Sequence, residues 1–158
     1  MADARSFDDR RVVVLDTSVV VKWYLTEGEG FVPEAVTYLE RHRDGMLRLA
    51  APELLAIELI SVLKRRGLDA ATVQLSLDRL FAAGIEWHSL TSIASAVADV
   101  TGHFPISAYD ACFAALANRL DAPFITADRR LARSGACDAR LLGEDDPPAA
   151  RDRRSVNE

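Results

Sequence analysis

The chain has 158 residues, enough for one ordinary domain, of which 49% are hydrophobic and 27% charged. This composition is typical of a globular protein and excludes wholesale disorder. The formal net charge of −5 argues against a protein that coats nucleic acid with its whole surface, although a local basic rim can still bind it. Two cysteines, Cys112 and Cys137, are too few for a disulfide-rich scaffold or a four-cysteine zinc site.

Short strands alternate with helices along the chain. In chain order, we expect a flexible N-terminus at residues 1–10, a strand at 12–15, a helical stretch up to residue 25, a loop at 26–30, a helix at 33–43 and a strand at 46–51. Helices at 52–66 and 69–83, a strand at 85–90, helices at 92–101 and 108–120, a strand at 123–126, a short helix at 128–133 and a strand at 139–142 follow. This alternation predicts an α/β fold with a parallel sheet flanked by helices.

The folded part is expected to be one domain, residues 11–143. The tail, residues 144–158, contains EDDPPAARDRR, a composition that predicts disorder. The longest unbroken apolar run, Ala111 to Ala117, is far below the roughly 18 residues of a membrane-spanning helix. The run Val12 to Leu15 is too short for the core of a signal peptide. We therefore expect a cytoplasmic protein with no membrane contact.

Four carboxylates stand out against their apolar surroundings. Asp16 directly follows the first predicted strand, and Asp128 comes just after the fourth. Because the carboxyl ends of parallel strands meet at one edge of a sheet, we expect both acids there. Asp110 opens a helix and Glu58 lies within an apolar one. Oxygen ligands without His or Cys suit a hard cation such as Mg²⁺ or Mn²⁺.

Each acid also has a purely structural interpretation. Asp16 can cap the helical stretch after it, and Asp128 can interact with the dipole of its short helix. Asp110 closes the sequence SAYD, which matches the capping-box pattern. Glu58 lies where the apolar and polar arcs of its helix meet and can be an ordinary boundary residue. The indication of a site comes from two acids at strand ends combined with two on helices that can pack beside them.

Four blocks of sequence carry a family resemblance. They are VVVLDTSVVVKWYL, APELLAIELISVLKRRG, SAYDACFAALANRL and APFITADRRLAR. In this order and spacing they resemble a PIN-domain ribonuclease, most closely the VapC-type toxins of bacterial and archaeal toxin–antitoxin pairs. The family pattern has an acid after the first strand, a Glu in the third helix, an Asp opening a later helix and T-x-D after the next strand. These positions hold Asp16, Glu58, Asp110 and Asp128.

The resemblance implies a PIN-like three-layer α/β/α fold with a central parallel sheet of four to five strands. It also implies a metal-dependent endoribonuclease that leaves a 5′-phosphate and a 3′-hydroxyl. One or two Mg²⁺ or Mn²⁺ ions would be held by Asp16, Asp110 and Asp128, with Glu58 completing or orienting the shell. The family places hydroxyls beside the acids, at positions that hold Thr17, Ser18 and Thr126, although helix capping is an equal alternative for these three. Many relatives carry an Asn after the Glu, where this chain has Ser61 and Val62.

Partners also follow from the resemblance. An RNA substrate is expected, with Arg129 and Arg130 as candidate RNA-binding residues; the basic run at residues 64–66 is more simply a solvated helix end. A small antitoxin protein is the second expected partner, docked between the helices at 33–43 and 52–66. A homodimer is the third, with candidate contact residues Val20, Trp23, Tyr24 and Leu39, although the same residues can instead fill the core of the monomer.

Other functions fit less well. A haloacid-dehalogenase phosphatase needs D-x-D and a late lysine, whereas this chain has Ser18 at the second position and no lysine after Lys64. A dinucleotide-binding fold needs a glycine-rich turn that DTSVV lacks. Two alternatives stay open: a catalytically silent PIN-like module that acts through protein contacts, and a housekeeping RNA-processing nuclease without an antitoxin.

Overall fold

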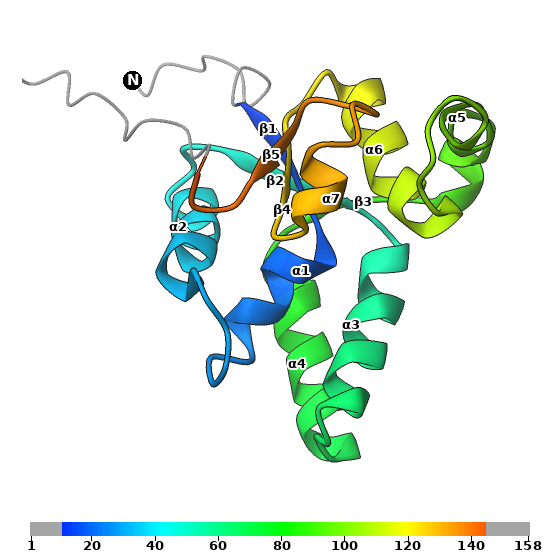
Figure 1. The fold of residues 1–158 in the computed structure, drawn as a ribbon. Coiled ribbons are helices and arrows are strands. Elements are labelled where there is room, and N and C mark those ends of the chain that lie inside the picture. The colour runs from blue at the N-terminus through cyan, green and yellow to red at the C-terminus, as the bar shows by residue number, and fades with distance from the viewer. Residues whose placement is uncertain (1–10, 145–158) are drawn as a thin grey trace, which may run out of the picture.

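The β-branched run near the start of the chain forms the central strand of a five-stranded parallel sheet (Figure 1). The computed structural model describes residues 11–144, so the predictions for residues 1–10 and for the tail beyond residue 144 lie outside the described residues. The sheet has the order β3-β2-β1-β4-β5, and every neighbouring pair is parallel. The strands are β1 (Val12–Leu15), β2 (Arg48–Pro52), β3 (Glu86–His88), β4 (Phe124–Thr126) and β5 (Ala139–Leu141).

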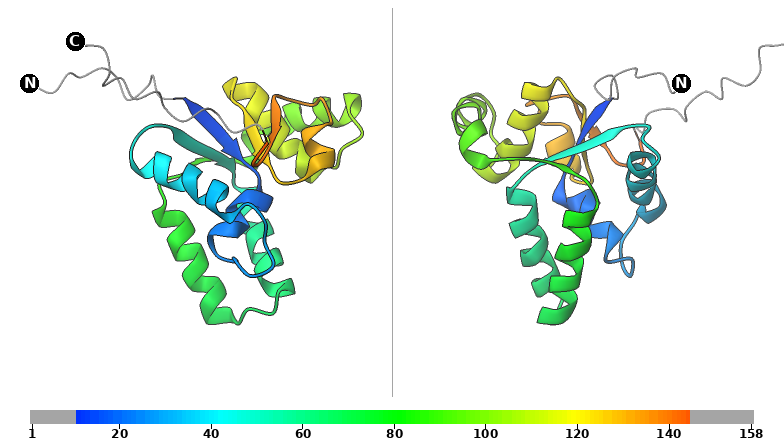
Figure 2. Two further views of the ribbon diagram at one scale, coloured as in Figure 1. Left: turned by 60° about the vertical axis from the view of Figure 1, so that its left-hand side comes forward. Right: turned by 180° about the vertical axis from the view of Figure 1, so that it is seen from behind.

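Helices cover both faces of this sheet. Those within residues 11–144 are α1 (Thr17–Val20), the 3₁₀ helix η1 (Val21–Trp23), α2 (Val32–Arg43), α3 (Leu54–Arg65), α4 (Ala70–Ala82), α5 (Leu90–His103), α6 (Ala108–Leu120) and α7 (Arg129–Ala132). Helix α6 packs on β1, β2 and β4 and is backed by α5, whereas α2 lies on the opposite face (Figures 1 and 2). The predicted three-layer α/β/α architecture is therefore confirmed. None of the helices in the described part of the chain is long and apolar enough to cross a membrane.

The predicted strands are all present, and the differences lie at element ends. The helix predicted from residue 52 begins at Leu54, because Pro52 pairs with His88 as the last residue of β2. The helix predicted at 92–101 starts earlier, since Ser89 Oγ caps it by accepting from the Ser92 amide. The first helical stretch divides into α1 and the 3₁₀ turn η1.

The core fixes how α6 and α3 stand relative to the end of β1. Residues 13–15 of β1 are at most 1% exposed, and Leu59 on α3 is fully enclosed. Phe113 of α6 stacks on Phe124 of β4 with ring centroids 5.8 Å apart. These contacts hold the start of α6 and the middle of α3 beside the carboxyl edge of the sheet, and α3 and α4 project beyond that edge (Figure 1).

Candidate active site

Asp16 lies at the carboxyl end of β1, where the chain leaves the sheet for α1. Its backbone amide still belongs to the sheet and donates to the Ile125 carbonyl of β4 at 2.9 Å. The residue is only 8% exposed. Its Oδ2 accepts hydrogen bonds from Ser18 Oγ at 2.6 Å and from Thr126 Oγ1 at 2.7 Å. Hydroxyl groups from the first turn of α1 and from the last residue of β4 therefore hold this carboxylate, and within residues 11–144 its side chain does not cap α1.

The two hydroxyls are themselves oriented by backbone amides. Ser18 Oγ accepts from the Ala127 amide at 2.9 Å, and Thr126 Oγ1 accepts from the Asp128 amide at 3.0 Å. Because each oxygen accepts an N–H, its own proton is directed towards the Asp16 carboxylate. The ends of β1 and β4 thus share one hydrogen-bond network that aims Asp16.

Glu58 reaches the same region from α3. Thr17 Oγ1 donates to Glu58 Oε2, which joins the first turn of α1 to the middle of α3. The side chain is half-buried, as its place at the border of the apolar arc predicts. The three hydroxyls expected beside the acids, those of Thr17, Ser18 and Thr126, therefore all contact a carboxylate.

Asp110 and Asp128 lie on either side of an arginine. The Arg130 guanidinium Nη2 is 3.3 Å from Asp110 Oδ2 and 3.7 Å from Asp128 Oδ2. Asp128 Oδ1 also caps α7, accepting from the Arg130 amide at 2.8 Å and the Leu131 amide at 3.2 Å. One oxygen of Asp128 therefore lies at the N-terminus of its short helix, in keeping with the structural interpretation through the helix dipole, while the other faces the arginine. In α6, Ser107 Oγ accepts from the Asp110 amide at 3.0 Å, which sets the start of the helix and leaves the Asp110 carboxylate to Arg130.

Electrostatics at this edge disfavour further negative charge. Burial raises the pKa of Asp16 above its ordinary value, hydrogen bonds from Ser18 and Thr126 act in the opposite direction, and the charge of Asp110 raises it further. Burial also raises the pKa of Glu58; the Thr17 hydrogen bond lowers it, and the charges of Asp16 and Asp110 raise it. The negative charges of neighbouring acids therefore add to burial in raising the pKa of both carboxyl groups.

The acids share one edge of the sheet but do not form a closed cluster. Within residues 11–144, no three Asp, Glu, His or Cys side chains gather as a group able to hold a metal ion. The Arg130 guanidinium stands between Asp110 and Asp128. Carboxylates repel one another when no cation lies between them, so the metal-free chain favours separated acids.

The two candidate RNA-binding arginines point in different directions. Arg129 Nη2 pairs with Glu144 Oε1 at 2.9 Å, whereas Arg130 faces the acids. Both side chains are more than half exposed. Farther away, Arg66 is tied to the loop at residues 26–30, where its Nη1 lies 2.9 Å from Glu29 Oε1, so it does not extend a basic rim.

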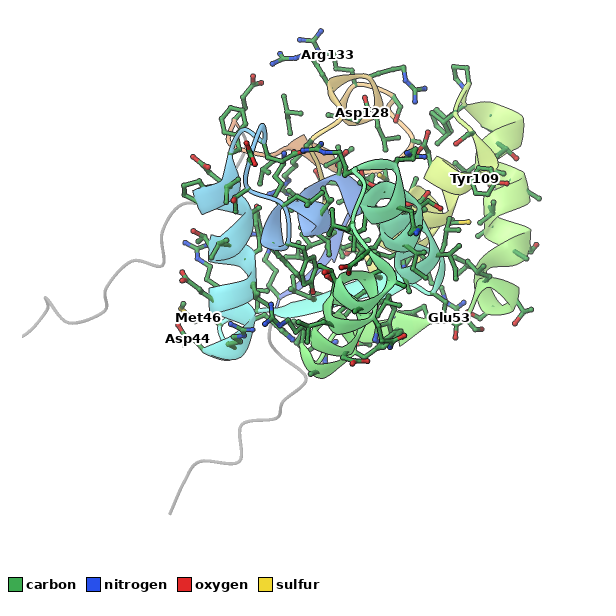
Figure 3. All side chains as sticks on the ribbon, turned by 90° about the horizontal axis from the view of Figure 1, so that it is seen from below. Asp44, Met46, Glu53, Tyr109, Asp128 and Arg133 are labelled. Atoms are coloured by element: carbon green, nitrogen blue, oxygen red, sulfur yellow. The ribbon has the colours of Figure 1, made fainter. Side chains whose placement is uncertain are left out.

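An open hollow of about 570 Å³ adjoins Asp16 and Glu58. Tyr109 and Ile57 form part of its wall, and both side chains are largely exposed. Figure 3, which views this edge of the sheet, shows Tyr109 and Asp128 on the same side of the molecule. The sequence predicts no role for Tyr109 or Ile57, although each directly precedes one of the four acids.

Fold and site together define a parallel α/β domain with an acidic centre at the carboxyl edge of its sheet. The PIN domain family model matches residues 13–136, and the chain belongs to this family, whose members are generally nucleases. None of the curated proteins is similar enough in sequence to count as a match.

Solved structures with the same fold include a toxin–antitoxin complex. VapBC2 from Rickettsia felis, bound to a DNA fragment from its promoter, gives a TM-score of 0.64 at 15% identity over 82% of this chain and 98% of that one. A toxin–antitoxin complex from Klebsiella pneumoniae gives 0.60 at 16% identity over 81% and 95%. FitAB bound to the IR36 DNA fragment gives 0.61 at 16% identity over 87% and 99%. At these identities the similarity concerns the fold.

Proposed function

We propose that this PIN domain is a Mg²⁺- or Mn²⁺-dependent endoribonuclease and the toxin of a type II toxin–antitoxin pair. The observation that carries the proposal is the buried Asp16 carboxylate, which two hydroxyls orient at the edge of the sheet and whose pKa the charge of Asp110 raises. A buried charge is costly unless it is paired or holds a metal. The Asp16 side chain has hydroxyl partners and, within residues 11–144, no basic one, so a bound cation would offset its charge.

The donor set fits a hard divalent ion, because all the candidate ligands are carboxylate oxygens. Asp16, Asp110 and Asp128 would hold it, with Glu58 completing or orienting the shell. When bound, such an ion supplies a water of lowered pKa and offsets charge on the phosphodiester. The chain's own hydroxyls act separately on the acids. Burial raises the pKa of both acids; the hydrogen bonds from Ser18 and Thr126 to Asp16, and from Thr17 to Glu58, act in the opposite direction and aim each carboxylate.

Chelation tests this proposal directly. Protein treated with EDTA is expected to leave RNA intact, and Mg²⁺ or Mn²⁺ is expected to restore cleavage, measured on total RNA by gel electrophoresis. Full cleavage after thorough chelation would overturn metal dependence. Intact RNA at every metal concentration would instead favour the silent protein-interaction module.

Arg130→Gln is expected to tighten Mn²⁺ binding by about two- to fivefold, because a cation no longer has to displace a guanidinium from Asp110 and Asp128. The magnitude follows from the modest strength of exposed ion pairs, up to about 1 kcal/mol. Isothermal titration calorimetry of the two proteins measures it.

Arg129→Gln is the matched control, since it removes the same charge from a side chain that pairs with Glu144 instead. Equal Mn²⁺ affinities for the two variants would show that Arg130 does not compete with metal. The exposed guanidinium groups of Arg129 and Arg130 remain the proposed contacts to RNA phosphates.

A protein antitoxin is the second proposed partner. The structural neighbours from Rickettsia felis and Klebsiella pneumoniae are toxin–antitoxin complexes. The hollow on the α2 side of the molecule, about 450 Å³, is lined by α2, α4 and the turn after η1. It differs from the groove expected between α2 and α3, because α4 packs along α3 and borders the hollow instead.

Co-expression with the neighbouring open reading frame is expected to rescue growth and give a stable complex, with or without the tail at 144–158. A protein that is harmless alone and binds no product of that reading frame would contradict this.

Homodimer formation is the third proposed interaction. Of the candidate contact residues, Val20 is fully buried in the core and is unavailable. Trp23, Tyr24 and Leu39 are partly exposed and line the 450 Å³ hollow. Light scattering at high micromolar concentration is expected to give twice the monomer mass, and a monomer alone would contradict it.

A further inference from the structure

Two large apolar side chains are exposed beside the acidic site. Tyr109 is 65% exposed in the first turn of α6, and Ile57 is 62% exposed on α3. Both line the hollow of about 570 Å³ that also reaches Asp16 and Glu58. Apolar surface that no core covers and that adjoins a polar site is typical of a binding surface.

The rest of the lining adds complementary chemistry. Leu54 and Val62 extend the apolar wall, Ser61 brings a hydroxyl, and Arg65 brings a positive charge. Arg65 and Glu58 line the same hollow, so the guanidinium lies on the wall that also carries the acidic end. The hollow therefore offers an aromatic ring, an aliphatic wall and a cation, all next to the acids.

We propose that this hollow binds one unpaired nucleobase of single-stranded RNA next to the bond that is cleaved, with the base stacked on Tyr109 and packed against Ile57, and with a neighbouring phosphate on Arg65. The inference rests on the proposed function and names its substrate class. Stacking on an aromatic side chain accepts any base, because every base has a π-face. In a duplex both faces of each base are covered by neighbouring bases, so duplex RNA cannot use this surface.

Charge complementarity favours RNA over a peptide segment as the occupant. A nucleotide supplies both a planar ring for Tyr109 and an anion for Arg65. An apolar peptide satisfies the wall of the hollow and leaves the Arg65 guanidinium without an anionic partner. Binding of a peptide in place of RNA is therefore one of the results that the experiment can give.

Fluorescence binding with short RNAs tests the subsite in the full chain. The probes are single-stranded RNA octamers with 2-aminopurine at each position in turn, and the proteins carry Asp16→Asn so that the RNA stays intact. We expect quenching of 2-aminopurine at one position. Tyr109→Ala is expected to abolish that quenching and to raise Kd about tenfold, whereas Tyr109→Phe retains both.

Phe81→Ala is the matched control, because Phe81 is 56% exposed on α4 and lies outside the lining of the hollow. It is expected to change neither Kd nor quenching. Melting curves establish that each variant is folded.

Three results would overturn the subsite. Tyr109→Ala could bind and quench like its parent; a duplex of the same sequence could bind as well as the single strand; or Tyr109→Ala could lose a co-purified protein partner while keeping RNA affinity. Metal-dependent cleavage by the wild type is measured in parallel. If cleavage persists while Tyr109 has no effect, the subsite fails and the proposed function stands; if the wild type neither binds nor cleaves RNA, both fail.

Discussion

Asp16→Asn is expected to abolish RNA cleavage and to leave the metal-free protein folded, with a Tm equal to or a few degrees above that of the wild type. An asparagine Oδ1 can accept the same two hydroxyl protons, from Ser18 and Thr126, that Asp16 Oδ2 accepts. The substitution removes a buried negative charge beside other carboxylates, so the folded state loses a repulsion and gains no void. The neutral amide is a poor ligand for a divalent ion, so cleavage is lost.

The Tm difference between Asp16→Asn and the wild type is expected to depend on pH. Burial raises the pKa of Asp16 above its ordinary value of 3.8. The folded state therefore holds the proton more tightly than the unfolded chain, and protonation stabilises the fold. That contribution is fully present below 3.8 and is lost as the pH rises through the raised pKa of the folded state. The difference in Tm between Asp16→Asn and the wild type is therefore expected to shrink as the pH falls from 7 towards 4.

Asp78→Asn is the control, because it removes an exposed carboxylate on α4 that Gln74 bonds at 2.9 Å. It is expected to keep full cleavage and an unchanged Tm. Asp110→Asn is expected to lose cleavage as Asp16→Asn does. A metal-free Asp16→Asn protein that melts well below the wild type would show that the carboxylate is structural.

Much of this site can be anticipated because its residues follow simple local patterns. Asp16 ends a β-branched run and Asp128 follows a second apolar run, and a parallel sheet brings such ends to one edge. Helix α6 has the bounds that the sequence predicts, because Ser107 caps its start and Asp121 ends it in the left-handed conformation with φ 48°.

Other features depend on long-range geometry that local patterns do not contain. The network between Ser18 and Thr126 links residues 108 positions apart. The place of Arg130 between Asp110 and Asp128 requires the relative position of α6 and α7. Exposed apolar residues such as Tyr109 are invisible to a pattern analysis, which assigns apolar residues to the core. The prediction that Val20 contacts a second copy of the chain is wrong, because Val20 is fully buried. Its burial depends on how α1 enters the fold, which local patterns do not contain.

Glu29→Ala is expected to lower the free energy of unfolding by about 2–4 kcal/mol, the range for breaking a buried ion pair. Lys22 is buried, with 6% exposure, and its Nζ donates to Glu29 Oε2 at 2.7 Å. The same carboxylate pairs with Arg66 through its other oxygen at 2.9 Å. Removing it leaves the Lys22 charge buried without its partner, so the folded state carries an uncompensated cation. Urea denaturation followed by circular dichroism measures the change.

Glu27→Ala is the matched control in the same loop, because that side chain is exposed; we expect a change below about 0.5 kcal/mol. Lys22→Met distinguishes the cost of burying an unpaired charge from the cost of losing the ion pair. It removes the cation and keeps an unbranched chain of similar length, so it is expected to cost less than Glu29→Ala, with Glu29 still paired to Arg66. The reverse order, or a Glu29→Ala protein as stable as the wild type, would contradict a buried ion pair.

Acid should act on this pair in the direction opposite to its effect at Asp16. The Lys22 hydrogen bond, and after it that from Arg66, lowers the pKa of Glu29 below its ordinary value of 4.5. The stabilisation from ionised Glu29 is therefore present above pH 4.5 and is lost as the pH falls through the lower pKa of the folded state.

Because Arg66 ends the helix that carries Glu58 and Arg65, the network of Lys22, Glu29 and Arg66 also fixes one end of α3. Glu29→Ala is thus expected to loosen α3 as well, seen as faster amide exchange at residues 62–66, whereas Glu27→Ala leaves that exchange unchanged.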